Sequence, residues 1–188
     1  MKYSLVLASQ SPRRRELLAV AGFQFSVRAR AVEEVRAAGE GPIEYVRRLA
    51  RAKAEAAWET PGEIILGADT IVVLDGRVLE KPSDANDARA MLRLLSGREH
   101  TVITGICLLH EHGAILDHSS TRVRFAVLSD SEIGHYVASG EPMDKAGAYA
   151  IQGRGSKFVV WVDGCYFNVM GLPLSLVYRH WKELTAAE

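Results

Sequence analysis

The fold is decided by the stretch Gly67-Ala-Asp-Thr-Ile-Val-Val-Leu-Asp-Gly-Arg-Val-Leu-Glu-Lys-Pro82. The apolar residues 64–66 just before it predict a short buried strand, and Thr70 to Leu74 predict a second strand. Asp75-Gly76 then forms a tight turn, and the chain returns through residues 78–79 as a hairpin. This pattern indicates a sheet with one carboxylate, Asp69, at the junction between two strands.

Within this stretch, Asp69 is a candidate for catalysis or ligand binding. A carboxylate between two apolar runs is well placed for a metal, a catalytic water or a buried partner cation. Lys81, just beyond the hairpin, could supply a compact positive charge for a phosphate. The alternative is a hairpin in which Asp69 only caps a turn and Lys81 is solvated, and both interpretations stay open here.

Composition limits the classes of function. The chain has 188 residues, of which 48% are hydrophobic and 24% charged, which is enough for one sizeable core or two small lobes. Lys plus Arg and Asp plus Glu both number 23, so the net charge is zero. A nucleic-acid or membrane-surface binder normally carries excess positive charge, and we therefore expect neither partner.

The sequence also predicts the compartment. The apolar run Leu5 to Ala8 is far too short for the hydrophobic part of a signal peptide, and no stretch approaches the length of a membrane span. We therefore expect a cytoplasmic protein. Cys107 and Cys165 show no close metal-binding spacing, and we expect both to be reduced packing residues.

A basic helix follows the predicted first strand, Ser4 to Ala8. Ser11 as N-cap, Pro12 at the first helical position and Gly22 past the end define the helix. Residues 13–15 are three arginines crowded at the end where the helix dipole is already positive. This arrangement suits phosphate binding, although a solvated basic face is the simpler alternative.

Two further features are candidates for the same kind of ligand. Glu33 and Glu34 are adjacent acids that are either loop charges or ligands for a divalent cation. The predicted helix from Ile43 to Thr60 has a buried stripe that includes position 53, which is occupied by Lys53. That lysine either extends its charge to the solvent or projects toward an anionic ligand.

The second half of the chain is predicted to consist mostly of helices and strands with a structural role. Four histidines, at positions 100, 110, 112 and 118, show no metal spacing and are expected to be ordinary polar positions. The expected elements are a helix capped by Asp84 that ends at Ser96-Gly97, strands over Thr101 to Leu109 and Ile115 to Phe125, a helix behind the capping box Ser129-x-x-Glu132, a hairpin of Phe158 to Val162 with Cys165 to Val169, and a final helix after Pro173.

One segment, Glu141 to Gly155, is too rich in glycine and small residues for regular structure. It carries Lys145, Tyr149 and Gln152, which suggests a binding loop. The amide of Gln152 can both donate and accept hydrogen bonds, as recognition of a base edge requires. Together, Gln152, the basic residues and Asp69 define a cleft that would suit a nucleoside triphosphate with a divalent metal. From physical chemistry alone, the residues indicate phosphate-ester chemistry and nothing more specific.

The motifs resemble those of a known family. The four blocks are Ser9-Gln-Ser-Pro-Arg-Arg-Arg-Glu-Leu-Leu18, Gly67-Ala-Asp-Thr70 with Lys81-Pro82, Leu95-Ser-Gly-Arg-Glu-His100 and Glu141-Pro-Met-Asp-Lys-Ala-Gly-Ala-Tyr-Ala-Ile-Gln-Gly153. In this order they closely resemble the Maf family of nucleoside triphosphate pyrophosphatases, over nearly the whole chain.

The resemblance implies a fold and an activity. The implied fold is an α/β fold of the Maf/inosine-triphosphatase-like type, with a long mixed twisted sheet flanked by helices. Residues 1–188 would form a single Maf-like domain of two lobes with a central cleft, commonly as a homodimer. The implied reaction cleaves a nucleoside triphosphate between the α- and β-phosphates with a divalent cation, usually Mg or Mn, and releases pyrophosphate.

The resemblance also implies roles for individual residues. Asp69 matches the family's proton acceptor and, with Glu34, a position linked to the metal. The positions that match phosphate-binding residues are Ser9, Arg14, Lys53 and Lys81.

Three positions, Arg13, Thr70 and Gln152, match those that select the base, and their combination resembles the branch that acts on dTTP and UTP. Alternatives are a house-cleaning enzyme for modified nucleotides such as 7-methyl-GTP, or a nucleotide-binding regulator of septum formation.

Overall fold

A computed structural model describes residues 3–186, which form two compact units. Unit 1 contains the chain up to Asp69, Thr104–Ser119 and the chain from Gly171, and unit 2 contains Thr70–Ile103 and Ser120–Met170. The strands are β1 (Ser4–Leu7), β2 (Phe25–Val27), β3 (Glu63–Leu74), β4 (Arg77–Leu79), β5 (Glu99–His110), β6 (Gly113–Phe125) and β7 (Val159–Asp163). The α-helices are α1 (Pro12–Val20), α2 (Pro42–Ala57), α3 (Ala85–Leu95), α4 (Asp130–Ala138), α5 (Tyr166–Met170) and α6 (Leu174–Ala186).

The strands form a mixed seven-stranded sheet in the order β2-β1-β3-β5-β6-β7, with β4 paired to β3. In unit 1, β1 is parallel to both β2 and β3, with Leu5 opposite Ile64 on β3. In unit 2, β4 is antiparallel to β3 and β7 is antiparallel to β6. The predicted α/β class, with a mixed sheet flanked by helices, is therefore confirmed.

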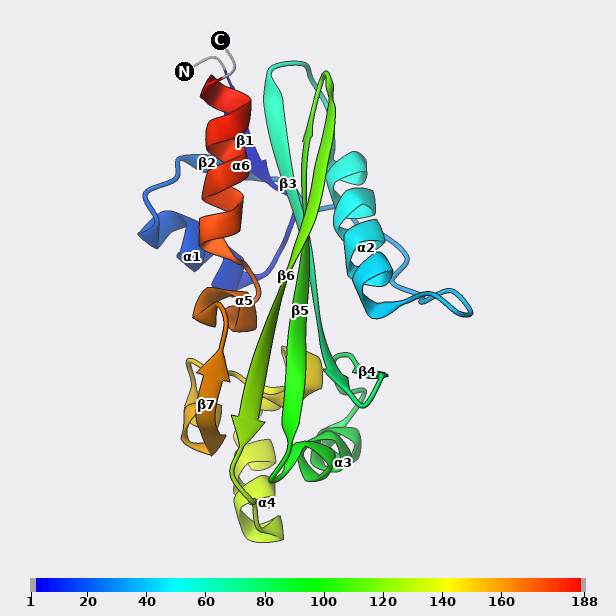
Figure 1. Ribbon diagram of the computed structural model, residues 1–188, viewed down its shortest axis with the longest axis vertical. Coiled ribbons are helices and arrows are strands. Elements are labelled where there is room, and N and C mark those ends of the chain that lie inside the picture. The colour runs from blue at the N-terminus through cyan, green and yellow to red at the C-terminus, as the bar shows by residue number, and fades with distance from the viewer. Residues whose placement is uncertain (1–2, 187–188) are drawn as a thin grey trace. The chain divides into compact units, whose positions relative to one another are not determined.

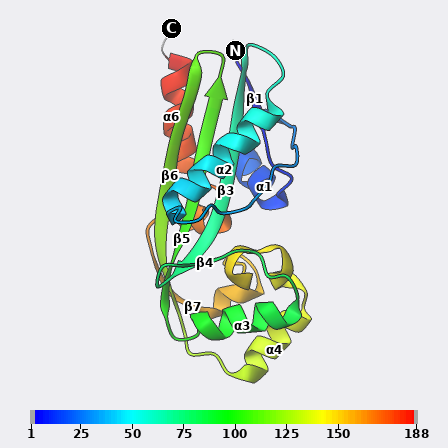
Figure 2. The same ribbon diagram turned by 90° about the vertical axis from the view of Figure 1, so that its right-hand side faces the viewer.

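Unit 1 has helices on both faces of its part of the sheet. Figures 1 and 2 show α2 on one face and α1 with α6 on the other. The apolar stripe predicted for α2 is buried, and two glycines let the helix lie directly on the strands. A Cβ atom at Gly67 would lie 2.0 Å from the carbonyl oxygen of Ala50. A Cβ atom at Gly105 would lie 2.5 Å from the carbonyl of Val46.

The predicted strand junction at Asp69 is wrong. β3 runs without interruption from Glu63 to Leu74, so Asp69 lies inside one long strand. The small residues Gly67 and Ala68 suggest a break by their composition. Gly67 is small because α2 packs closely against β3 at this position, and the extended backbone continues through both residues.

Unit 2 is organised around a core of its own, built from β3 to β7, α3, α4 and the short turns that follow. Figure 2 shows α3 and α4 beside those turns. Both predicted caps are confirmed: the Asp84 carboxylate accepts from the first amides of α3, and Ser129 with Glu132 forms a capping box on α4. The predicted turn at Asp75-Gly76 is also confirmed, with both residues at positive φ.

A second error concerns the segment after β7. The sequence predicts that Cys165 to Val169 returns as a strand, but Tyr166–Met170 forms the short helix α5. The buried Asn168 donates to the Val102 carbonyl at 3.0 Å and to the Thr121 hydroxyl at 3.0 Å. These hydrogen bonds hold the helical turn against β5 and β6. The pattern of apolar residues could not predict them.

The structure also describes the two cysteines and the lengths of the helices. Both cysteines are free thiols, and burial raises the pKa of Cys107 to about 12, so its thiol is unreactive. None of the helices formed by residues 3–186 combines the length and hydrophobicity needed to span a bilayer.

Candidate active site

Asp69 projects from β3 into the interior of unit 1, where it is 8% exposed. Its Oδ1 atom lies 2.6 Å from Nζ of Lys53. Burying a lone carboxylate would be costly, and the ammonium group compensates for the lost hydration. Asp69 is thus a paired interior charge and does not cap a turn.

Lys53 comes from the sheet-facing side of α2. Its Nζ atom also lies 2.7 Å from Oε1 of Glu34, and its side chain is 13% exposed. Of the two interpretations left open by the sequence, the ammonium therefore points inward to two carboxylates. Because α2 lies against β3 at Gly67, Lys53 reaches the carboxylate of Asp69, two residues further along that strand.

The environment of Asp69 acts on its proton affinity in two directions. Burial is the larger effect and raises the pKa of Asp69 above its ordinary value, while Lys53 and Arg14 oppose that rise. A carboxylate with a raised pKa is a stronger base than one in water, and the neighbouring ammonium favours its ionised form. The arrangement can accept a proton from a bound water molecule.

Arg14 is buried, so its side chain is not part of a solvated basic face. Its Nε donates to the Gly171 carbonyl at 2.8 Å, and one terminal nitrogen donates to the Ala68 carbonyl at 2.9 Å. The same nitrogen donates to the Ser9 hydroxyl at 3.2 Å, and burial lowers the pKa of Arg14. Arg14 therefore fixes the turn between β1 and α1 beside the strand residue that precedes Asp69.

The other arginines of α1 differ in exposure. Arg13 is partly buried, and Arg15 is exposed. The first turn of α1 contains no acidic residue, so the positive end of the helix dipole is reinforced by basic side chains. A helix start of this kind favours an anion, and anion binding here stays a prediction.

The two carboxylates around Lys53 could also serve a divalent cation. Carboxylate oxygens are hard ligands of the kind that Mg²⁺ and Mn²⁺ prefer. Within residues 3–186, no group of three or more His, Cys, Asp or Glu side chains is arranged to hold a metal. An ion held by Asp69 and Glu34 would have to take its other ligands from water and substrate phosphates, which is usual for Mg²⁺.

Three predicted site residues belong to unit 2. Thr70 directly follows Asp69 in β3 and is partly buried. Lys81 is exposed after β4, and Gln152 is exposed in the loop after α4. The structure thus brings Ser9, Arg14, Glu34, Lys53 and Asp69 together in unit 1, and it places the other candidates, apart from Arg13, in unit 2.

His100 was expected to be an ordinary polar position, but it is buried in the structure. It is 2% exposed, and its Nε2 atom lies 2.9 Å from the hydroxyl of Tyr149 in the predicted binding loop. Burial lowers the pKa of His100 to about 4, so its ring is neutral. The available signal was the alternation that places His100 on the same inward side of β5 as Val102.

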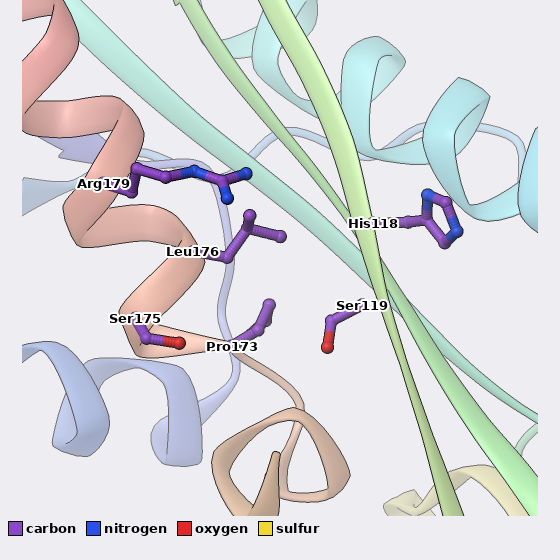
Figure 3. Close-up of a pocket in the computed structure, with 6 residues that line it drawn as sticks. All are labelled: His118, Ser119, Pro173, Ser175, Leu176 and Arg179. Carbon is purple, nitrogen blue, oxygen red and sulfur yellow. The ribbon is translucent and has the colours of Figure 1, made fainter. Parts of the chain in front are cut away.

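A pocket of about 390 Å³ lies elsewhere in unit 1 (Figure 3). It is lined by His118, Ser119, Pro173, Ser175, Leu176 and Arg179. None of these is a predicted site residue, and Arg179 pairs with Asp117 at 3.0 Å. The pocket therefore shares no lining residue with the candidate active site.

Together, fold and site define an α/β protein with a buried aspartate held by a lysine, near a helix whose first turn is basic. Comparison with known proteins identifies its family. The family described as "Maf-like protein" matches residues 4–184. The chain belongs to this family, as its motifs predicted.

Individual relatives agree with this assignment. A dTTP/UTP pyrophosphatase of Koribacter versatilis is 53% identical over 176 residues, covering 93% of this chain and 91% of the relative. Proteins with the same name from Vibrio cholerae and Thermococcus gammatolerans are 52% and 49% identical over 175 residues, covering 90% and 93% of this chain and 92% and 94% of their own lengths.

Among solved structures, a HAM1 protein from Coxiella burnetii has the same fold. Its TM-score is 0.53 with 17% sequence identity, and the match covers 96% of this chain and 99% of that protein. At this identity the similarity shows the architecture alone.

Proposed function

We propose that this chain is a nucleoside triphosphate pyrophosphatase that hydrolyses dTTP and UTP to the monophosphate and pyrophosphate. The observation that carries the proposal is the buried Asp69, held at 2.6 Å by Lys53 beside Glu34. Relatives about half identical over nearly the whole chain carry the name of this activity.

In the proposed reaction, Asp69 accepts a proton from the water that attacks the α-phosphorus. As the bond to phosphorus forms, the bond from phosphorus to the bridging oxygen breaks, and pyrophosphate leaves with that oxygen. Negative charge grows on the phosphate oxygens, and positioned cations stabilise it. We assign Lys53 in unit 1 and Lys81 in unit 2 to this role, with Ser9 and Arg14 binding phosphate or shaping its site.

A divalent cation, Mg²⁺ or Mn²⁺, is part of the proposal. Asp69 and Glu34 would hold it, and it would supply charge stabilisation to the phosphates when bound. Loss of pyrophosphate release on chelation and its return with added Mg²⁺ would support this assignment. We further propose a homodimer, as the family resemblance implies, and a cytoplasmic location, where nucleotides are found.

Base selection is assigned to Arg13, Thr70 and Gln152. Their residue types resemble the branch that acts on dTTP and UTP, and Gln152 has an exposed amide suited to a base edge.

The test is pyrophosphate release measured across dTTP, UTP, 7-methyl-GTP and other natural triphosphates at equal concentration. We expect dTTP and UTP to be preferred, and Arg13→Ala with Gln152→Ala to change the ranking. The matched control is Arg15→Ala, an exposed arginine of the same helix, which should keep the ranking. A wild-type preference for 7-methyl-GTP would replace the proposal with its house-cleaning alternative.

A further inference from the structure

The segment of residues 145–155, here called the Gln152 loop, lies entirely in unit 2 and contains only short 3-10 turns. Backbone amides that lack regular structure need other hydrogen-bond partners when they are buried. The partners in this loop come from specific side chains of unit 2, and their positions relative to Gln152 are informative.

The first partner is Tyr136 on α4, which is 3% exposed. Its hydroxyl accepts a hydrogen bond from the amide of Ala150 at 3.0 Å. The same hydroxyl donates to Oε1 of Glu141 at 2.8 Å. One buried hydroxyl thus joins the loop on the N-terminal side of Gln152 to a carboxylate.

That carboxylate holds the other side of the loop. Oε2 of Glu141 accepts from the Arg154 amide at 3.0 Å, and Oε1 accepts from the Gly155 amide at 3.2 Å. Partial burial alone would raise the pKa of Glu141, but these hydrogen bonds and the one from Tyr136 lower it overall. The ionised carboxylate is therefore an acceptor for three donors, and the tethered residues 150 and 154 bracket Gln152 closely.

Two glycines of the loop, Gly153 and Gly155, lie close to the same two side chains. A Cβ atom at Gly153 would lie 2.4 Å from Oε2 of Glu141. A Cβ atom at Gly155 would lie 2.8 Å from the Tyr136 hydroxyl. Glycine is needed here because the two side chains approach the backbone directly, so the composition that predicted an irregular loop marks a tightly held one.

A third tether lies deeper in unit 2. The Tyr149 hydroxyl lies 2.9 Å from Nε2 of His100, and both rings pack edge-on against Phe125, with centroids 4.7 Å and 5.0 Å away. The loop residues that precede Gln152 are thus anchored in the core, while the Gln152 side chain is exposed.

We propose that Tyr136 and Glu141 are positioning residues that hold the Gln152 side chain in the orientation that recognises the base. They set nucleotide discrimination through the loop backbone and take no part in the chemical step. This inference rests on the proposed pyrophosphatase function and on the assignment of Gln152 to base selection.

The test uses Tyr136→Phe, which keeps the ring in the core and removes only the hydroxyl. We expect the ratio of kcat/KM for dTTP over 7-methyl-GTP to fall about tenfold, because misplacing a binding group is costly even when the chemistry is unchanged. The change should lie in KM, with kcat for dTTP retained. Glu141→Gln, which keeps one acceptor oxygen, should give a smaller loss than Glu141→Ala.

A double-mutant cycle separates positioning from a general structural role. If Tyr136 acts through Gln152, then Tyr136→Phe should change discrimination little in a Gln152→Ala background. If Tyr136→Phe does not fold, the same cycle is run with Glu141→Gln. Full additivity of the two effects, or a loss of kcat in place of discrimination, would overturn the inference alone. A wild-type protein that releases pyrophosphate from no nucleotide would overturn the proposed function as well.

Discussion

The Asp69 site of unit 1 and the Gln152 loop of unit 2 are held in place by different means. Around Asp69, charged side chains from β3, α2 and the segment between β2 and α2 contact one another, with Lys53 between two carboxylates. In the Gln152 loop, side chains hold backbone amides, and Gln152 itself projects outward. The first site therefore depends on which side chains are present, and the second depends on the path of the main chain.

This difference predicts different consequences of mutation. Removing one charge from the Asp69 site leaves its partner buried without compensation, which damages stability and chemistry together. Removing one tether from the Gln152 loop changes the placement of a recognition group and should affect the choice of substrate. Variants of the Asp69 site should therefore show the larger losses.

The largest effect is expected for Lys53→Met, which keeps an unbranched side chain that is one atom shorter and removes its charge. Breaking a buried ion pair costs about 3–5 kcal/mol, which urea unfolding would measure. Without the ammonium, the pKa of Asp69 should rise further, so less of the carboxylate is ionised near neutral pH. Pyrophosphate release should then fall by about 10²–10⁴-fold.

The matched control for that variant lies on the same helix. Arg51 forms an exposed pair with Glu55 at 2.6 Å, and such surface pairs contribute about 0.3–0.5 kcal/mol. Arg51→Met should therefore leave turnover unchanged. Equal losses in the two variants would show that α2, and not the Lys53 charge, is what the site requires.

A smaller effect is expected for Gly147→Ala in the Gln152 loop. Gly147 has φ 66°, and a Cβ atom there would lie 2.7 Å from Cγ2 of Val72. Strain and overpacking should cost about 1–3 kcal/mol, and displacement of the loop should raise KM for dTTP more than it lowers kcat. Thermal unfolding and steady-state kinetics would measure the two effects.

Gly140→Ala provides the comparison for the glycine variant. Gly140 has φ 76°, but a Cβ atom there would have no atom of another described residue within 4 Å, its chain neighbours aside. Alanine at this position therefore meets only backbone strain of about 1 kcal/mol. Its KM for dTTP should stay at the wild-type value. An equal rise in KM in both variants would contradict the idea that the loop contact with Val72 matters.

The smallest effect is expected for a charge pair of unit 1 that lies outside the candidate site. Asp117 contacts Nε2 of His180 at 2.8 Å and Arg179 at 3.0 Å. Burial alone would raise the pKa of Asp117, but the hydrogen bond from His180 and the nearby positive charges lower it overall. Asp117→Asn should cost about 1–2 kcal/mol and leave pyrophosphate release intact.

The pH dependence of that stability has a defined sign. Because the folded pKa of Asp117 lies below the unfolded value of about 3.9, its contribution is present above that pH and is lost as pH falls through the folded pKa. In urea titrations at several pH values, the difference between wild type and Asp117→Asn should shrink in acid. A difference that grows in acid would contradict the assignment.

The sequence singled out Asp69 and Lys53 but left the direction of the Lys53 side chain open. A lysine on an apolar stripe and an acid within an apolar run are local anomalies of charge, which are visible without a structure. It could not show that Arg14 donates to the Gly171 carbonyl, because that contact joins segments near opposite ends of the chain. It also predicted a break in β3 at Gly67, although this glycine lies within the continuous strand and accommodates α2.

For the Gln152 loop, the sequence predicted the position of a binding segment but not the hydrogen bonds that hold it. Its composition indicated a binding segment, and Gln152 was singled out by its amide, but Tyr136 and Glu141 were assigned no role. Their part depends on main-chain donors several residues away, and no spacing rule encodes those hydrogen bonds. His100 was missed for a related reason, since its partner Tyr149 lies 49 positions along the chain.

Asp69 accepts the proton of the attacking water in the proposed reaction, and the other roles depend on this step. The most direct test is Asp69→Asn, which preserves shape and removes the basic oxygen, assayed by pyrophosphate release from dTTP and by calorimetric binding of dTTP. We expect turnover to fall at least about 100-fold, with the Kd for dTTP changed less than about threefold. Pyrophosphate release near the wild-type rate would remove Asp69 from the reaction.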